Sequence, residues 1–152
     1  MSQPTSFPST TSNFDLPLLF AGQAQKEFFV NQSLSLIDAI IGRSVIASIN
    51  VPPPSPTEGE NYRITAPAEG DWASHEDDIA ISIGGAWNFV RARDGMALFD
   101  RAAGQFILFR SGWHIASHPT EPQGGTTIDQ ESRIAIVELT EALRTIGILP
   151  EI

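Results

Sequence analysis

Three tryptophans, Trp72, Trp87 and Trp113, are the residues of this chain whose chemistry points most directly to a function. Trp87 and Trp113 each follow a glycine turn, and Trp72 lies in an acidic loop. A flat indole stacks on the apolar face of a pyranose, and polar neighbours such as His75 and Asn88 bind the sugar hydroxyls. The sequence therefore predicts a carbohydrate-binding surface formed by these five residues.

The competing interpretation is that the aromatic side chains fill the core of a small β-domain. We expect this of the phenylalanines in the β-type runs, which are Phe89, Phe99, Phe106 and Phe109. Tryptophan is also highly buried on average, so the sequence by itself favours a core position for the three indoles. Solvent exposure of the indoles distinguishes the two interpretations.

Metal chemistry has two weak candidates. The acidic run 75–78, with Glu69 and Asp71 nearby, gathers the oxygen ligands that Ca²⁺ prefers, but its spacing matches no EF-hand and favours an exposed turn. The chain has three histidines, His75, His114 and His118, and their spacing is not the helical or hairpin spacing of a transition-metal site. We predict neither a metal nor a cofactor.

Catalytic signatures are weak as well. Asp94, Asp100 and the acidic loop offer carboxylates, yet nothing places two of them across a sugar as glycoside hydrolysis requires. No Gly-x-Ser-x-Gly elbow occurs, and the run 111–113 is a turn. We predict that the chain is not an enzyme, with a polysaccharide- or peptidoglycan-degrading enzyme as an alternative.

The scaffold that must position these side chains is a β-meander. Short β-type runs alternate with glycine turns from Ile79 to Ala116, and such alternation is typical of antiparallel strands. Apolar spacing predicts a helix over 22–41, in which Asn31 would permit a break into two shorter helices. The remaining predicted elements are an extended segment at 14–21, strands at 45–51 and 62–65, a proline connector at 52–56, a loop at 66–78 and a last helix from 127 to about 147.

This order predicts an α+β fold, with an N-terminal helix, a small antiparallel β-meander sheet or barrel, and a C-terminal amphipathic helix. Composition divides the chain into four parts, which are a flexible N-terminal segment at 1–13, a helical segment with a short strand at 14–51, the β-meander domain at 52–116, and a loop with the C-terminal helix at 117–152.

The predicted last helix carries an apolar stripe of four residues at spacings of three, four and three, formed by Ile136, Leu139, Leu143 and Ile146. Such a stripe is either a coiled-coil seam in an oligomer or the inner face of a helix docked on its own domain. Coiled coils usually sustain more heptads, so the pattern favours docking. Thr127 and Gln130 fit a capping box at its start, and Gly147 fits its end.

Charge and composition exclude several function classes. Eighteen acidic against nine basic residues give a net charge of −9, which disfavours nucleic acid and anionic membrane surfaces as partners. The chain has no cysteine, so disulfides and thiolate metal sites are excluded. No apolar run reaches the roughly 18 residues of a membrane helix, and residues 1–12 lack the layout of a signal peptide. We expect a soluble protein without membrane insertion.

The segments and their order resemble a family of uncharacterised domains found in tail-fibre-like virion proteins of alphaproteobacterial prophages and gene transfer agents. The resemblance covers residues 16–116 and rests on Leu16-Pro17, Gln23-Ala24-Gln25-Lys26, Asn31, Leu36-Ile37-Asp38-Ala39, Pro53, the run from Ser55 to Tyr62, the run from Gly70 to His75, Ile79-Ala80, Gly85-Ala86-Trp87 and Arg93-Asp94-Gly95. The helix at 131–147 is similar to the closing helix common in phage tail proteins.

The resemblance implies a virion structural and adhesion module of a tail fibre or spike that binds cell-surface polysaccharide. It implies a homotrimer that contacts tail, baseplate or head proteins, is assembled in the bacterial cytoplasm and is released by lysis; a purely structural assembly or adaptor protein is the alternative. At two positions where the family usually has histidine, this chain has Glu27 and Val30. At four positions where the family usually has tryptophan, it has Ser82, Met96, Phe99 and Phe109. These departures bear on any metal or sugar role of those positions.

Overall fold

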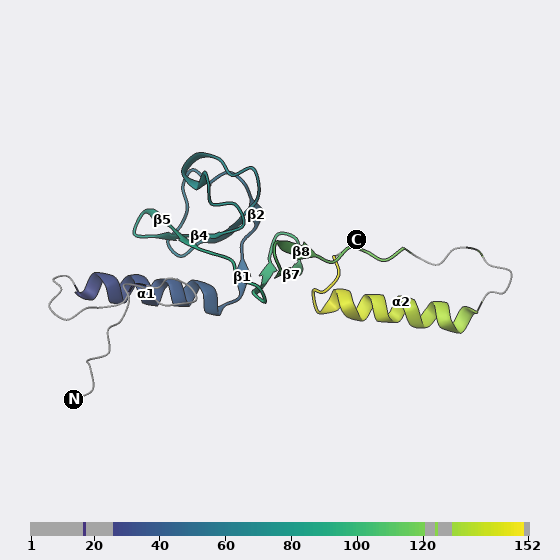
Figure 1. Ribbon diagram of the computed structural model, residues 1–152. Helices are drawn as coiled ribbons and strands as arrows, with labels where there is room; N and C mark the ends of the chain where they lie inside the picture. The colour runs from purple at the N-terminus through teal and green to yellow at the C-terminus, as the bar shows by residue number, and fades with distance from the viewer. Residues whose placement is uncertain (1–16, 18–25, 121–123, 125–128, 151–152) are drawn as a thin grey trace, which may run out of the picture.

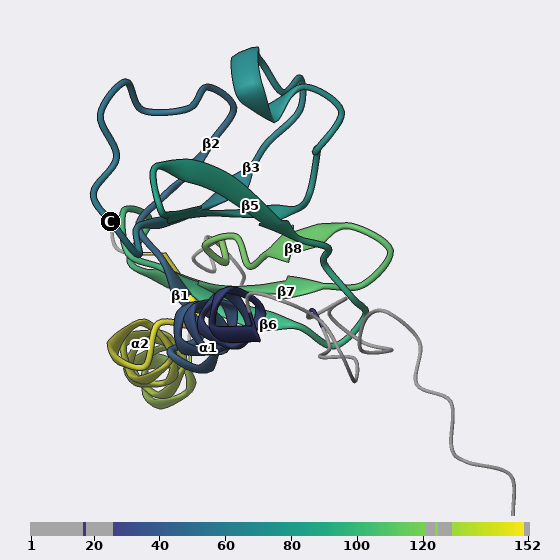
Figure 2. The same ribbon diagram turned by 90° about the vertical axis from the view of Figure 1, so that its left-hand side faces the viewer.

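The computed structural model describes residues 17, 26–120, 124 and 129–150. Helix α1 (Lys26–Ile41) is followed by eight short strands and then by helix α2 (Gln130–Thr145). Figure 1 shows the two helices at opposite ends with the strands between them, and the rotated view of Figure 2 shows both helices nearly end-on, on one side of the sheets. The predicted α+β class is confirmed, and neither sheet closes into a barrel.

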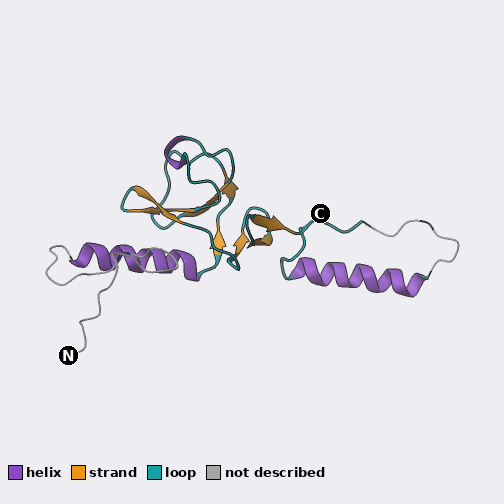
Figure 3. Cartoon of the chain, in the orientation of Figure 1, coloured by secondary structure: helices purple, strands orange, loops and turns teal. Residues whose placement is uncertain are grey.

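The strands form two four-stranded sheets, coloured orange in Figure 3. The first sheet has the order β1-β6-β7-β8, and the second has the order β2-β3-β4-β5. Their bounds are β1 Ser44–Val45, β2 Ser48–Ile49, β3 Asn61–Ile64, β4 Ile79–Ile83, β5 Ala86–Val90, β6 Ala97–Asp100, β7 Gln105–Phe109 and β8 Trp113–Ile115. The predicted meander therefore exists as hairpins, but it is divided between two sheets after β5.

The segment that we predicted as one strand at 45–51 is two strands in different sheets. Strand β1 pairs parallel with β6, and β2 pairs parallel with β3, while all other pairings are antiparallel. The chain crosses from one sheet to the other at Ile46 and Ala47, so the prediction of a single strand is wrong. The 3-10 helix η1 (Gly70–Trp72) lies in the segment predicted as a loop.

The main core lies between α1 and the two sheets. It consists of Leu36, Val45, Ile79, Ile81, Val90, Leu98 and Ile107, all less than 9% exposed. Helix α1 is continuous through Asn31, so the alternative of two shorter helices is not realised, and α1 buries Leu36 against this core. At its end, the Asn61 Nδ2 group donates to the carbonyls of Ala39 and Ser44, which fixes the turn from α1 into β1.

A buried polar network joins the two sheets. The Ser48 hydroxyl of β2 donates to Asp100 of β6 and accepts a hydrogen bond of 2.7 Å from Arg63 Nε of β3. Asp100 is 3% exposed, and its other carboxylate oxygen accepts from the backbone N–H groups of Ala102 and Ala103. Burial lowers the pKa of Arg63, while the charges of Asp100 and Asp77 act in the opposite direction.

Helix α2 differs from the expected docked helix because none of its residues is buried. Its N-cap is Asp129, whose side chain accepts from the Ser132 N–H at 3.0 Å. The predicted cap Thr127, the segment at 1–13 and the extended segment at 14–21 lie outside the described residues, apart from Pro17. Gly147 has φ +73° just past the helix, so the predicted C-terminal glycine is confirmed.

Candidate carbohydrate-binding site

The five residues predicted to bind carbohydrate fall in three places around the second sheet. Neighbouring residues of a strand point to opposite faces of its sheet, so Trp87 and Asn88 of β5 are separated by the sheet. Trp72 and His75 come from the 66–78 segment, which covers the outer face of this sheet. Trp113 is the first residue of β8 in the other sheet.

The outer face of the second sheet carries an aromatic cluster of Tyr62, Trp72 and Trp87. The Trp72 ring meets Trp87 edge-to-face with centroids 5.1 Å apart, and Tyr62 lies 5.9 Å from Trp72 and 6.1 Å from Trp87. Trp72 is 0% exposed and Tyr62 is 7% exposed, so both belong to a second core cluster with Ile64. The prediction that Trp72 offers a face to a sugar is therefore wrong for this conformation, whereas Trp87 is half-buried.

His75 extends this aromatic face along β5. Its ring stacks on Phe89 with centroids 3.6 Å apart and planes 7° from parallel, and its Nδ1 lies 3.0 Å from the Asp78 carboxylate. Phe89 stands two residues after Trp87, on the same face of the strand. The half-exposed surface of Trp87, Phe89 and His75 is the part of the predicted site that the structure brings together.

A carboxylate and a phenol lie at the edge of this surface. The Tyr62 hydroxyl donates to Glu60 Oε2 at 2.9 Å, and the Thr57 N–H donates to the same oxygen at 3.1 Å. The bond from the Thr57 backbone, followed by that from Tyr62, lowers the pKa of Glu60, while burial and then Glu60 raise the pKa of Tyr62. The pair therefore presents an ionised carboxylate and a protonated phenol, which suit sugar hydroxyls.

Trp113 is held by polar contacts on the other side of the acidic loop. Its indole N–H donates to the Asp77 carbonyl at 2.9 Å, the Arg63 guanidinium lies 5.9 Å from its ring centroid, and Phe109 meets it edge-to-face. Trp113 is half-buried and packs against the main core. It is thus close to the run 75–78, but its N–H is already engaged.

Asn88 lies in a pocket of about 520 Å³ between α1 and the β4–β5 hairpin, on the face opposite to Trp87. Its Oδ1 accepts a hydrogen bond of 2.9 Å from Gln32 Nε2 of α1. The pocket lining combines the polar residues Asn31, Ser35 and Glu58 with the apolar Ile83 and Ala86. Sequence reasoning missed this pocket, because only the α1–β5 packing places these amides together.

The acidic loop has no metal-site geometry. Glu76 accepts from the Ala68 N–H, Asp78 contacts His75, and Glu69 lies 3.4 Å from the Asn50 amide. Over 26–120, 124 and 129–150, no three His, Cys, Asp or Glu side chains gather in a group that could hold a metal ion. Asp94, considered for catalysis, accepts from the Ser111 N–H at 2.7 Å, and Asp100 lies in the buried network.

Together, the fold and the site define an α+β module of two small sheets with a half-exposed aromatic strip. Residues 30–114, more than half of the chain, match the family described as protein of unknown function (DUF2793), and the chain belongs to this family. The match begins within α1 and ends in β8, so α2 lies beyond it. No curated protein matches the chain. In the described part of the chain, no helix is long and apolar enough to span a membrane.

Proposed function

We propose that this chain is a structural and adhesion module of a phage or gene-transfer-agent tail fibre or spike, and that it binds cell-surface polysaccharide as a homotrimer. In this proposal the module is assembled in the bacterial cytoplasm with tail, baseplate or head proteins and is released by lysis. The resemblance of its segments to tail-fibre-like virion proteins supports the virion assignment.

The observation that carries the binding proposal is the strip formed by Trp87, Phe89 and His75. Trp87 and Phe89 stand at i and i+2 on one face of β5, roughly 7 Å apart, and the His75 ring covers Phe89, so the strip presents the Trp87 and His75 rings. Trp87 is backed by the buried Trp72, so its orientation is fixed before any ligand binds. Glu60 supplies a carboxylate acceptor beside it, held in place by the hydrogen bond that the Tyr62 hydroxyl donates to it.

Affinity electrophoresis of the full chain in gels that contain host capsular polysaccharide tests this proposal. We expect retardation of the parent chain and its loss in Trp87→Ala. Phe106→Ala is the matched control, because Phe106 is a 40% exposed aromatic residue on the first sheet. Retardation that Trp87→Ala leaves unchanged, or its absence in an oligomeric sample, contradicts the binding proposal.

A second candidate is an assembly component that joins a fibre to a baseplate or head without binding sugar. The burial of Trp72 and the engaged N–H of Trp113 favour it, because two of the three indoles then act in packing. Acrylamide quenching of single-tryptophan variants distinguishes the two functions. A quenched Trp87 supports sugar binding, whereas a shielded Trp87 in the assembled oligomer supports assembly alone.

A further inference from the structure

Helix α2 exposes apolar side chains that its own chain does not cover. Leu139 is 60% exposed, Ile146 is 59% exposed and Ile136 is 46% exposed. A helix with such residues normally packs them against a neighbouring element, because their transfer out of water is favourable. None of its residues is buried by the part of the chain that the structure describes.

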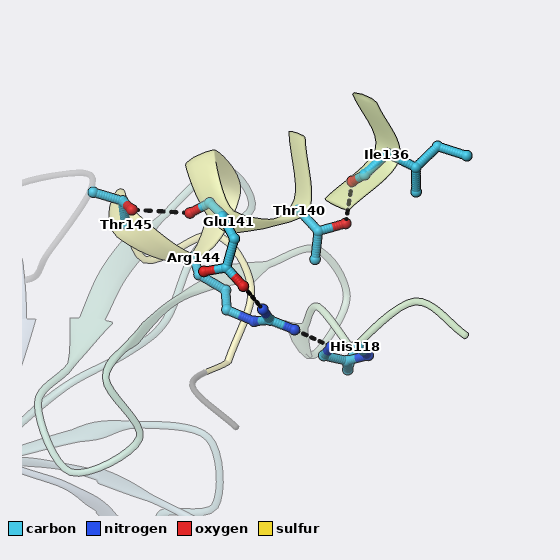
Figure 4. Close-up of polar contacts among 6 residues, drawn as sticks. All are labelled: His118, Ile136, Thr140, Glu141, Arg144 and Thr145. Carbon is cyan, nitrogen blue, oxygen red and sulfur yellow. Dashed lines mark hydrogen bonds and ion pairs between the residues drawn. The ribbon is translucent and has the colours of Figure 1, made fainter. Parts of the chain in front are cut away.

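Three exposed apolar residues of α2 share one face with the half-buried Leu143, whereas the exposed Ile134 and Val137 lie on the opposite face. Ile136, Leu139, Leu143 and Ile146 follow the alternating spacing of three and four that defines a two-heptad seam. Ala135 and Ala142 flank the seam, and such small side chains allow a neighbouring helix to approach closely. Contacts with the preceding segment are made by other residues: Figure 4 shows Arg144 reaching His118, while the Ile136 side chain projects outward.

Helix α1 carries a second uncovered stripe with the same kind of spacing. Val30, Leu34, Ile37 and Ile41 are separated by four, three and four residues and are 38%, 58%, 43% and 74% exposed. This stripe lies on a different face from Leu36, which packs in the main core. The two helices therefore present matching seams at the two ends of the chain.

We propose that these two seams form the interface between copies of this chain, with each α2 packed against the α2 of a neighbouring copy and each α1 against α1, in parallel. This inference rests on the proposed function, in which the module is an oligomer, and it names the surface that holds the oligomer together. The two helices have nearly parallel axes and opposite chain directions on one side of the sheets in Figures 1 and 2, so rotation about one axis along them would place each helix parallel to its counterpart in a neighbouring copy.

The exposed apolar area of the two stripes together supplies a large part of the apolar surface that such an interface contains. A fully exposed aliphatic side chain offers roughly 60–120 Å² of apolar surface, so the seven most exposed residues of the two stripes offer on the order of 200–450 Å². An interface of about 800 Å² per partner that is about 65% apolar contains about 500 Å² of such surface.

The distribution of charge on α2 is consistent with packing against a second copy of this chain. Copies with a net charge of −9 repel one another, so carboxylates at the interface would oppose assembly. The α2 seam and its flanking alanines carry none. The acidic residues Glu131, Glu138 and Glu141 fall at other heptad positions, outside the seam.

Sedimentation equilibrium of Leu139→Glu and Ile134→Glu tests the proposal. Both parent residues are more than half exposed in the single chain, so neither change removes a core contact, but only Leu139 lies in the seam. We expect the parent chain and Ile134→Glu to sediment as multiples of 16.5 kDa, and Leu139→Glu to raise the dissociation constant at least about tenfold. Tryptophan emission, which reports the buried Trp72, verifies that the sheets remain folded.

Single cysteines give a second readout that does not depend on weakening the assembly. The chain has no cysteine, so Leu139→Cys introduces one thiol, and a parallel seam places two copies of it within disulfide range. We expect oxidised Leu139→Cys to run as a covalent dimer and Ile134→Cys to remain a single chain. A Leu139→Cys sample that stays uncrosslinked, or a Leu139→Glu sample with the parent's mass, overturns the proposed seam.

These outcomes are separable from those of the binding proposal. A monomeric parent chain at high micromolar concentration overturns the interface, and its retardation by polysaccharide through Trp87 remains measurable in the monomer. Conversely, an oligomer held by the α2 seam that shows no retardation confirms the interface and contradicts the adhesion function.

Discussion

Trp72 meets Trp87 edge-to-face, with ring centroids 5.1 Å apart and planes inclined at 79°. The two indoles differ in exposure, because Trp72 is 0% exposed and Trp87 is half-buried. The buried Trp72 therefore supports the Trp87 ring from below, and Trp87 is the indole that a ligand can contact. The division explains how a residue that cannot touch a ligand in this conformation still contributes to the aromatic strip.

Replacement of Trp72 by alanine is expected to destabilise the fold by about 3–5 kcal/mol, because a large buried ring is removed and its cavity remains. Trp87→Ala is expected to cost clearly less, since that ring is already partly in water. Urea denaturation measures both free energies of unfolding. Equal losses in the two variants would contradict the assignment of Trp72 as the support.

The buried network between the sheets gives a second prediction. Asp100→Ala removes the acceptor of the Ser48 hydroxyl and of two backbone N–H groups, and it removes one of the two carboxylate charges, those of Asp100 and Asp77, that favour the charged form of the half-buried Arg63. We expect a loss of about 3–5 kcal/mol, as for other buried charges whose partner is removed. Asp94→Ala, which removes one exposed acceptor, is the control and is expected to cost about 1 kcal/mol or less. A smaller loss for Asp100→Ala than for Asp94→Ala would contradict a role in joining the sheets.

Local signals in the sequence predicted most of the elements, apart from the division of 45–51 into two strands and the helix η1, but not their assembly. The α1 spacing, the glycine turns of the hairpins and the position of Gly147 each depend on a few neighbouring residues, and each agrees with the structure. The division into two sheets depends on parallel pairing of β1 with β6, whose residues Ser44 and Phe99 are far apart in the chain. No short-range pattern specifies such a pairing.

The site was predicted in part for the same reason. Neighbouring residues of a strand point to opposite faces of its sheet, so the sequence already indicated that Trp87 and Asn88 of β5 do not share a surface. The burial of Trp72 was not foreseeable from its acidic neighbours, because η1 turns its ring under the loop and against Tyr62. The exposure of α2 was not foreseeable either, since an amphipathic stripe is the same whether its partner is its own domain or another chain.

Helix α2 is predicted to lose stability in acid through its N-cap. The N–H and then the hydroxyl of Ser132 donate to Asp129 and lower the pKa of its carboxyl group. A carboxyl group whose pKa is lower in the folded than in the unfolded chain stabilises the fold above its unfolded value of about 3.9, and this stabilisation is lost as the pH falls through the folded value. Circular dichroism across this window should show helicity falling in the parent chain.

Asp129→Asn is the matched control for this effect, because asparagine caps helices about as well as aspartate and does not titrate in this range. We expect the acid-dependent loss attributable to the cap to disappear in this variant. Ser132→Ala removes the hydroxyl donor while keeping the backbone bond, so an intermediate dependence is expected. An identical acid response in the parent and in Asp129→Asn would assign the effect to other carboxylates.

The end of α2 depends on Gly147, which approaches the first sheet closely. Its φ is +73°, and a Cβ placed on it would lie 2.8 Å from Phe99 Cε2, so Gly147→Ala introduces both backbone strain and a clash with a ring that packs on Phe106. The strain alone is about 1–2 kcal/mol. Gly59→Ala is the matched control, because Gly59 has φ +81° and no atom within 4 Å of the added Cβ. Thermal denaturation should show a larger loss for Gly147→Ala, and equal losses would mean that the Phe99 ring moves aside at no cost.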